Sequence, residues 1–193
     1  MKIAVIGTAG RNEDGQKLSK EKFFEMVALV SKLKDAKEAT LVSGGAAWAD
    51  HIAVVVFLLG NCKSLSLHLP CAWDVLREQY ADTGEFDWRT NPGGTANHYH
   101  HRFAKKLGYD ENYTLRQIHQ ATLKEAMIHT GAGFHDRNSA VASEADMLFA
   151  FTFGDGARVA DGGTRDTFEK YIKLGKKAAY HFNLNEMKLY SAE

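Results

Sequence analysis

Three glycine-rich turns hold residue types that suit the binding of a phosphate or a sugar. Glycine permits positive φ and lets a ligand approach the bare backbone, and a helix that starts after such a turn presents N–H groups and a partial positive charge. Any one turn is as often an ordinary tight turn, but three that meet at one edge of a sheet predict a binding site. The residues assigned to the site from these turns are Gly7, Thr8, Gly10 and Arg11, then Ser43, Gly44, Gly45 and Asp50, and then Gly162, Gly163 and Thr164.

Basic and amide side chains near the third turn are candidates for holding the ligand. Arg137 heads a predicted helix, and its guanidinium could hold a phosphate through paired hydrogen bonds. Asn138 and Arg165 are polar candidates around the same site. The alternative for Arg137 is an ordinary surface ion pair with Asp136 or Glu144.

Two carboxylates, Asp166 and Glu169, follow the third turn. A carboxylate beside a bound sugar can stabilise developing positive charge or position a water molecule. The alternative for Glu169 is a solvated carboxylate on a helix face, paired with Lys173 one turn further on.

The elements that must position these residues alternate between strand and helix. Because the strands are apolar runs, the pattern predicts a parallel sheet with helices on both faces, a Rossmann-like α/β fold that forms a single domain over 1–193. Ligands bind such sheets at the carboxyl ends of the strands, so the three turns should converge there. Strands are predicted over 2–6, 40–42, 64–69, 147–153 and 177–182, and helices over 19–34, 47–59, 137–144 and 165–174.

The region 71–133 interrupts this pattern as an irregular and partly helical insertion, with a helix predicted over 114–127. Insertions of this kind are often lids or partner surfaces. Its aromatic residues Trp73, Trp88 and Tyr99 are interpreted as the core of the insertion, with a platform for a stacked base as the alternative. The histidines are interpreted as a solvated or interface loop, so we expect no metal site and no cofactor; they are His98, His100 and His101, with His119 or His129.

Charge and cysteine content narrow the class of protein. The chain has 24 Lys and Arg against 24 Asp and Glu, and the lack of a basic excess argues against a dedicated nucleic-acid partner. Cys62 and Cys71 have no metal-type spacing, which indicates reduced thiols. The start of the chain lacks a signal-peptide pattern and the apolar run 52–59 is too short to span a bilayer, so we predict a cytoplasmic protein with no membrane partner. That run is either plain core or the interface of a homodimer.

Three segments resemble the SLOG superfamily, which includes the LONELY GUY phosphoribohydrolases, often described as lysine decarboxylase-like, and the Rossmann domain of DNA-processing protein A. The segment 43–50 is similar to its GGA-x-GAD turn, with Trp48 where a glycine is usual. Segment 134–138 resembles the MHxRK segment, and 162–169 resembles the PGGxGTxxE segment. The resemblance covers 1–70 and 131–184 but not the insertion.

The resemblance implies roles for two residues. In LONELY GUY enzymes an arginine and a glutamate serve cleavage of the N-glycosidic bond of a nucleoside monophosphate, and the matching positions are Arg137 and Glu169. A second register, which aligns Gly163 and Thr164 with the family's Gly-Thr pair, places Thr167 at the glutamate position instead.

The sequence therefore predicts a site for a nucleotide or nucleotide-derived ligand, in one of two classes of protein. The first is an enzyme that cleaves a nucleoside monophosphate through an oxocarbenium-like state. The second is a non-catalytic sensor that binds a nucleotide-derived signal. Binding of single-stranded DNA, as in the DNA-processing protein, is disfavoured by the zero net charge.

Overall fold

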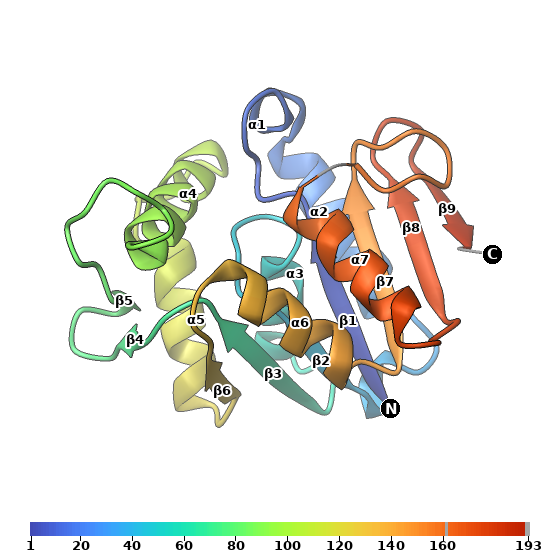
Figure 1. Ribbon diagram of the computed structural model, residues 1–193, viewed down its shortest axis with the longest axis horizontal. Helices are drawn as coiled ribbons and strands as arrows, with labels where there is room; N and C mark the ends of the chain where they lie inside the picture. Colours follow the sequence, from blue (N-terminus) through green and yellow to red (C-terminus); the bar gives the residue numbers. More distant parts are fainter. Residues whose placement is uncertain (161, 192–193) are drawn as a thin grey trace.

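The computed structural model describes residues 1–160 and 162–191 and centres on a seven-stranded sheet (Figure 1). Its strand order is β6-β3-β2-β1-β7-β8-β9, and every pair is parallel except β8 with β9. The strands are β1 (Lys2–Gly7), β2 (Thr40–Ser43), β3 (Ser64–Leu69), β6 (Met127–Thr130), β7 (Met147–Thr152), β8 (Ala179–Asn183) and β9 (Lys188–Ser191). The predicted Rossmann-like α/β fold is confirmed.

The order in which the chain adds strands to the sheet reverses at β1. From β1 the chain adds β2 and β3 on one side, and later adds β7 and β8 on the other, so β1 lies between β2 and β7. In open α/β sheets a crevice forms at such a switch point, outside the carboxyl ends of the strands. The first and third glycine turns follow these carboxyl ends, at the upper edge of the sheet in Figure 1.

Helices cover both faces of the sheet. The helices α2 (Lys20–Ser31) and α3 (His51–Leu58) pack on one face, and α6 (Phe134–Glu144) and α7 (Gly163–Lys173) pack on the other (Figure 1). Side chains of β1 alternate accordingly. Ile3 and Val5 join the core on the α2–α3 side, and Ala4 and Ile6 join the core beneath α6 and α7.

The helix α3 is core rather than an open interface. Residues 51–56 are all buried, and α3 packs against α2, β2, β3 and α5 (Tyr113–Leu123). A helix that is apolar on every side is expected to be surrounded by protein. In the described part of the chain, no helix is long and apolar enough to cross a membrane.

Helix caps explain where two helices begin. The Ser19 hydroxyl accepts a hydrogen bond from Lys22 N at 3.2 Å, which makes Ser19, the first residue of the predicted helix, the N-cap of α2. The Asn91 side chain accepts from Gly94 N at 2.9 Å, and Pro92 occupies the first position of α4 (Pro92–Lys106). The interpretation of the histidines at 98–101 as a loop was therefore wrong, because they lie on α4 and His100 is completely buried.

Several segments differ from their sequence-based assignment. The helix predicted to reach residue 127 ends at Leu123, because Glu125 takes positive φ and Met127 starts β6. The interval 11–17, for which no element was predicted, contains the single turn α1 (Asp14–Lys17). β8 is not the last strand, since β9 follows it. The insertion also holds a small ribbon of β4 (Trp73–Asp74) and β5 (Gln79–Tyr80).

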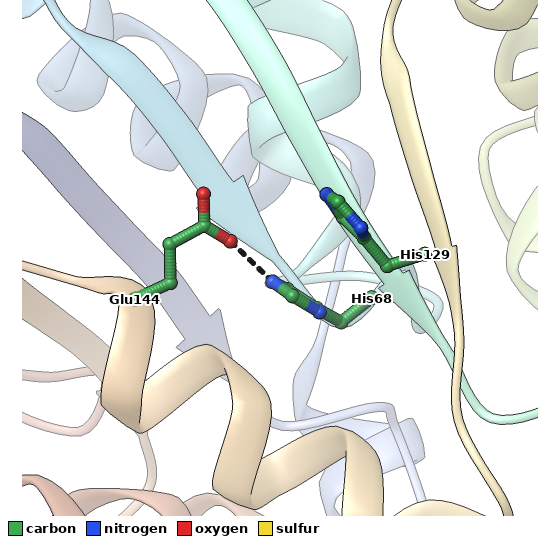
Figure 2. A group of neighbouring side chains, drawn as sticks. All are labelled: His68, His129 and Glu144. Atoms are coloured by element: carbon green, nitrogen blue, oxygen red, sulfur yellow. Dashed lines mark hydrogen bonds and ion pairs between the residues drawn. The ribbon is translucent and has the colours of Figure 1, made fainter.

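The strand β6 returns the insertion to the sheet before residue 133. It pairs with β3 in a register that sets His129 directly beside His68. Figure 2 shows the two rings stacked on the face of the sheet that Glu144 of α6 approaches. The last part of the region 71–133 therefore belongs to the sheet rather than to the insertion.

Candidate ligand-binding cleft

A cleft of about 890 Å³ opens at the carboxyl ends of β1 and β7. Its walls come from the first glycine turn and α1, from the start of α6 and from the start of α7, with Trp88 of the insertion at its edge. This is the position that the strand order predicts for a ligand.

The cleft gathers most of the residues predicted from the sequence. Those that line it are Gly7, Thr8, Arg11, Gly44, Asp50, Arg137, Asn138, Gly162, Gly163, Thr164 and Asp166. Those that do not line it are Gly10, Ser43, Gly45, Arg165 and Glu169.

Glu169 and Arg165 lie outside the cleft and pair with each other. Arg165 Nε donates to Glu169 Oε1 at 2.8 Å, and the Glu169 side chain is 49% exposed. The partner of Glu169 is thus Arg165 rather than Lys173. Thr167, which the second register places at the glutamate position, is buried and does line the cleft.

The amides of the first two turns are largely satisfied by the protein itself. Gly7 N and Ala46 N donate to the two carboxylate oxygens of Asp50, at 3.1 and 3.5 Å. Thr8 N donates to the carbonyl of Phe151, and Gly10 N donates to the Thr8 hydroxyl. These turns therefore shape the cleft wall and do not present these amides to an anion.

Asp50 joins the first turn to the second. Its side chain is buried, and this burial raises the pKa of Asp50 above its usual value against the opposing attraction of Arg137. A Cβ on Gly44 would lie 2.7 Å from Asp50 Oδ2 and 2.8 Å from Arg137 Nε. Glycine at this position thus leaves room for both charged groups.

Trp48 occupies a backbone position that favours glycine. Its φ is +62°, in the left-handed region. The indole is buried and its ring centroid lies 4.4 Å from that of Phe103 and 6.2 Å from that of Phe23. These aromatic contacts offset the backbone strain and fasten the second turn to the core.

The third turn differs from the other two because a helix begins there. The N-cap Gly162 has no side chain, and among contacts between described residues the first amide of α7 that donates to a backbone carbonyl is Asp166 N, to Gly162 O at 3.0 Å. A Cβ on Gly163 would meet only Asn138 Nδ2, at 3.6 Å. The amides of the first turn of a helix lack acceptors within the helix, so this end of α7 suits an anion.

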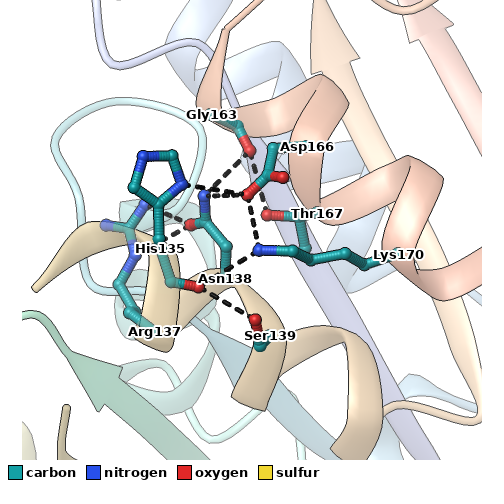
Figure 3. Close-up of polar contacts among 8 residues, drawn as sticks. All are labelled: His135, Arg137, Asn138, Ser139, Gly163, Asp166, Thr167 and Lys170. Carbon is teal, nitrogen blue, oxygen red and sulfur yellow. Dashed lines mark hydrogen bonds and ion pairs between the residues drawn. The ribbon is translucent and has the colours of Figure 1, made fainter. Parts of the chain in front are cut away.

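A polar network joins the start of α6 to the start of α7 (Figure 3). Asn138 Nδ2 donates to Asp166 Oδ2 at 3.0 Å and to Gly163 O at 3.3 Å. Lys170 Nζ donates to the same Asp166 oxygen at 2.8 Å, and His135 Nδ1 lies 3.6 Å from it. Partial burial acts to raise the pKa of Asp166, but these hydrogen bonds outweigh it and lower the pKa below its usual value. Asp166 is therefore an ionised carboxylate in the cleft.

Arg137 is held by the cleft wall rather than by a surface carboxylate. Its Nη1 donates to Gly44 O at 3.2 Å, and its Nη2 donates to Asn138 Oδ1 at 3.0 Å. The guanidinium also lies 5.3 Å from the centroid of the Phe134 ring. A guanidinium has five N–H donors, so donors remain for a ligand.

Aromatic side chains line part of the cleft, which the sequence predicted only as the alternative interpretation of Trp88 and did not predict for Phe134. Trp88 is 38% exposed and its ring centroid lies 6.0 Å from that of Phe134, so it is not buried core. Arg11 lies over both the Phe134 and the Tyr99 rings, at 5.5 and 5.2 Å. Trp73 packs against the core, and no local pattern distinguishes it from Trp88.

The two cysteines take no part in the cleft. Both are free, and burial raises the pKa of Cys62 and of Cys71 to about 11. The thiols therefore stay protonated, and protonated thiols are poor nucleophiles.

A viral protein shares most of this chain. The "Uncharacterized protein R261" of Acanthamoeba polyphaga mimivirus is 37% identical over 185 residues, which cover 92% of this chain and 93% of the viral protein. The chain belongs to the family of this viral protein. No family model and no solved structure matches the chain. Because the alignment covers 92% of the chain, this family shares most of the insertion as well as the sheet.

Proposed function

We propose that the cleft binds a phosphorylated nucleoside or a ligand derived from one. The observation that carries this proposal is that the N-terminus of α7, at Gly163 and Thr164, lines the same cleft as the guanidinium of Arg137. Backbone amides at a helix start and a guanidinium are complementary to a phosphate. The resemblance of segments 134–138 and 162–169 to the SLOG superfamily supports the same ligand class.

Other side chains of the cleft suit the nucleoside. The exposed face of Trp88 and the ring of Phe134 offer apolar surface for a base. Glu13 and Asp14 also line the cleft, and carboxylates accept hydrogen bonds from ribose hydroxyls. The cleft thus combines an anion site with groups that fit a sugar and a base.

Replacing Arg137 with glutamine is expected to weaken nucleotide binding by about 10-fold to 100-fold, because a charge-assisted hydrogen bond is replaced by a neutral one. Isothermal titration with a panel of nucleoside mono- and diphosphates measures the effect. The matched control is Arg165→Gln, which removes an arginine that lies outside the cleft and pairs with Glu169. Equal losses in both variants, or no binding of any panel member by the wild type, would contradict the proposal.

Cleavage of the N-glycosidic bond is the second candidate function, and Asp166 is the observation that favours it. Its ionised carboxylate lies in the cleft, where it could stabilise an oxocarbenium-like sugar. Glu169, the position that the family resemblance assigns to this role, points away and pairs with Arg165.

The Asp166→Asn variant is expected to lose base release by at least about 100-fold while it still binds nucleotide, because the amide keeps an oxygen that can accept from Asn138 and Lys170 but lacks the negative charge that stabilises the transition state. Liquid chromatography of wild-type and variant incubations with nucleoside monophosphates resolves the free base. Glu169→Gln is the control and should retain wild-type release. If the wild type binds a nucleotide and returns it intact, the protein is a sensor rather than a glycosidase.

A further inference from the structure

Three potential metal ligands gather on the sheet face beneath α6, outside the cleft. His68 and His129 are neighbours on β3 and β6, with ring centroids 4.7 Å apart and ring planes 19° apart. Glu144, at the end of α6, forms an ion pair with His68 Nε2 (Figure 2). One ligand atom from each residue lies within 4.8 Å of the other two.

We propose that His68, His129 and Glu144 bind a divalent transition-metal ion, with Zn²⁺ as the best fit. Two imidazole nitrogens and one carboxylate oxygen are a ligand set that holds zinc and leaves a position open to water. Ligand atoms around tetrahedral zinc lie about 2.0–2.2 Å from the ion, so small side-chain rotations would close the cluster around it. His129 is exposed, which leaves the ion a path of entry from solvent.

The groups around Glu144 support its role as a ligand. Ser66 donates its hydroxyl to Oε2 at 3.0 Å, and Lys2 Nζ lies 3.0 Å from Oε1. These contacts fix the carboxylate so that Oε2 faces the histidines, as hydrogen bonds from a second layer of residues orient ligands in metal sites. The Lys2 side chain is 47% exposed, so it can turn toward solvent when the ion supplies the positive charge.

The ion would hold the edge of the sheet in place. β6 is a short strand whose residues are mostly exposed, and it pairs with β3 at the edge of the sheet. An ion bound to His129 would attach β6 to β3 through His68 and to α6 through Glu144. Binding only to the folded state stabilises that state. The bound ion would therefore stabilise the folded state, and the site is independent of the ligand proposed for the cleft.

The test uses the full chain, freed of any affinity tag and dialysed against chelator, titrated with Zn²⁺ alone and then with Co²⁺ as a spectroscopic probe. We expect one Zn²⁺ per chain, visible Co²⁺ absorption of a four-coordinate site, and a rise in the melting temperature with Zn²⁺. His129→Ala should weaken Zn²⁺ binding by about 100-fold or more and abolish that rise. Because His129 is exposed, this variant should fold.

His98→Ala is the matched control, since His98 is an exposed histidine on α4 outside the cluster. It should bind Zn²⁺ as the wild type does. The proposal is overturned if the wild type binds Zn²⁺ no more tightly than His129→Ala, or if His98→Ala loses as much affinity as His129→Ala. Glu144→Gln, which keeps the shape of the side chain, should reproduce the loss seen for His129→Ala.

Discussion

Alanine in place of Gly7 is expected to lower the free energy of unfolding by about 3 kcal/mol, at the upper end of the cost of overpacking. A Cβ at this position would lie 2.2 Å from the carbonyl oxygen of Phe151 and 2.5 Å from Ala49 Cβ. The Phe151 oxygen belongs to the backbone of β7, the strand that pairs with β1. The same oxygen accepts a hydrogen bond from Thr8 N at 2.9 Å. The strain can therefore be relieved only by separating the two central strands.

Urea denaturation of wild type and variant measures this effect. The control is Gly163→Ala, because the added Cβ would meet only an ordinary contact at 3.6 Å from Asn138 Nδ2. Gly163 is the first residue of α7, and alanine stabilises a helix by about 1 kcal/mol at most relative to glycine. This variant should therefore be as stable as the wild type or slightly more stable. A Gly7→Ala protein with wild-type stability would mean that β1 and β7 do not approach as described.

Lowering the pH from 7 to 5 is expected to destabilise the protein through two buried histidines. Burial lowers the pKa of His51 to about 4 and that of His100 to about 3. Below the unfolded-state pKa of about 6.5, the unfolded chain gains protons that the folded chain cannot accept. The stability that these residues contribute is complete above about pH 6.5 and is lost as the pH falls toward 4 and 3. Each fully titrating histidine contributes about 1.4 kcal/mol per pH unit.

The slope of stability against pH isolates this contribution. Much of the loss falls above the pH at which carboxylates protonate, so chemical denaturation at closely spaced values between pH 7 and 5 resolves it. His100→Gln removes one titrating group, so its slope should be shallower by about one proton, whatever its absolute stability. His98→Gln, which changes an exposed histidine on the same helix, should keep the wild-type slope. An unchanged slope in His100→Gln would rule out His100 as the source.

Local patterns predicted the parts of the fold that depend on burial alone. The strand Ser64–Leu69, in which polar and apolar residues alternate, was predicted with the same bounds, and the helix predicted from residue 19 begins at its cap Ser19. β6 was missed because it is short and mostly exposed, so its sequence carries no burial pattern. α4 was missed because Pro92 and two glycines are typical of a loop, although proline is well tolerated at the first position of a helix.

The residues of the cleft were predictable only in part, because helix orientation decides which side chains face it. Thr167 and Tyr171 are the buried residues of α7 and anchor it to the sheet. Glu169 lies two residues from each of them, about 200° around the helix, so it must face solvent. The sequence established that a carboxylate follows the third turn, but only the packing of α7 selects Asp166.

The two ends of the region 71–133 lie side by side, since Gly131 N donates to Leu69 O at 2.8 Å and Gly133 N donates to Pro70 O at 2.9 Å. Neighbouring ends of this kind are typical of an insertion that can be deleted, but this insertion packs into the core. Its Phe103 belongs to the same buried cluster as Phe23 and Trp48, and the hydroxyl of Tyr80 donates to the carbonyl of Gly45. Deletion of the insertion would expose core residues that are now buried. We therefore expect a chain without it to be unfolded.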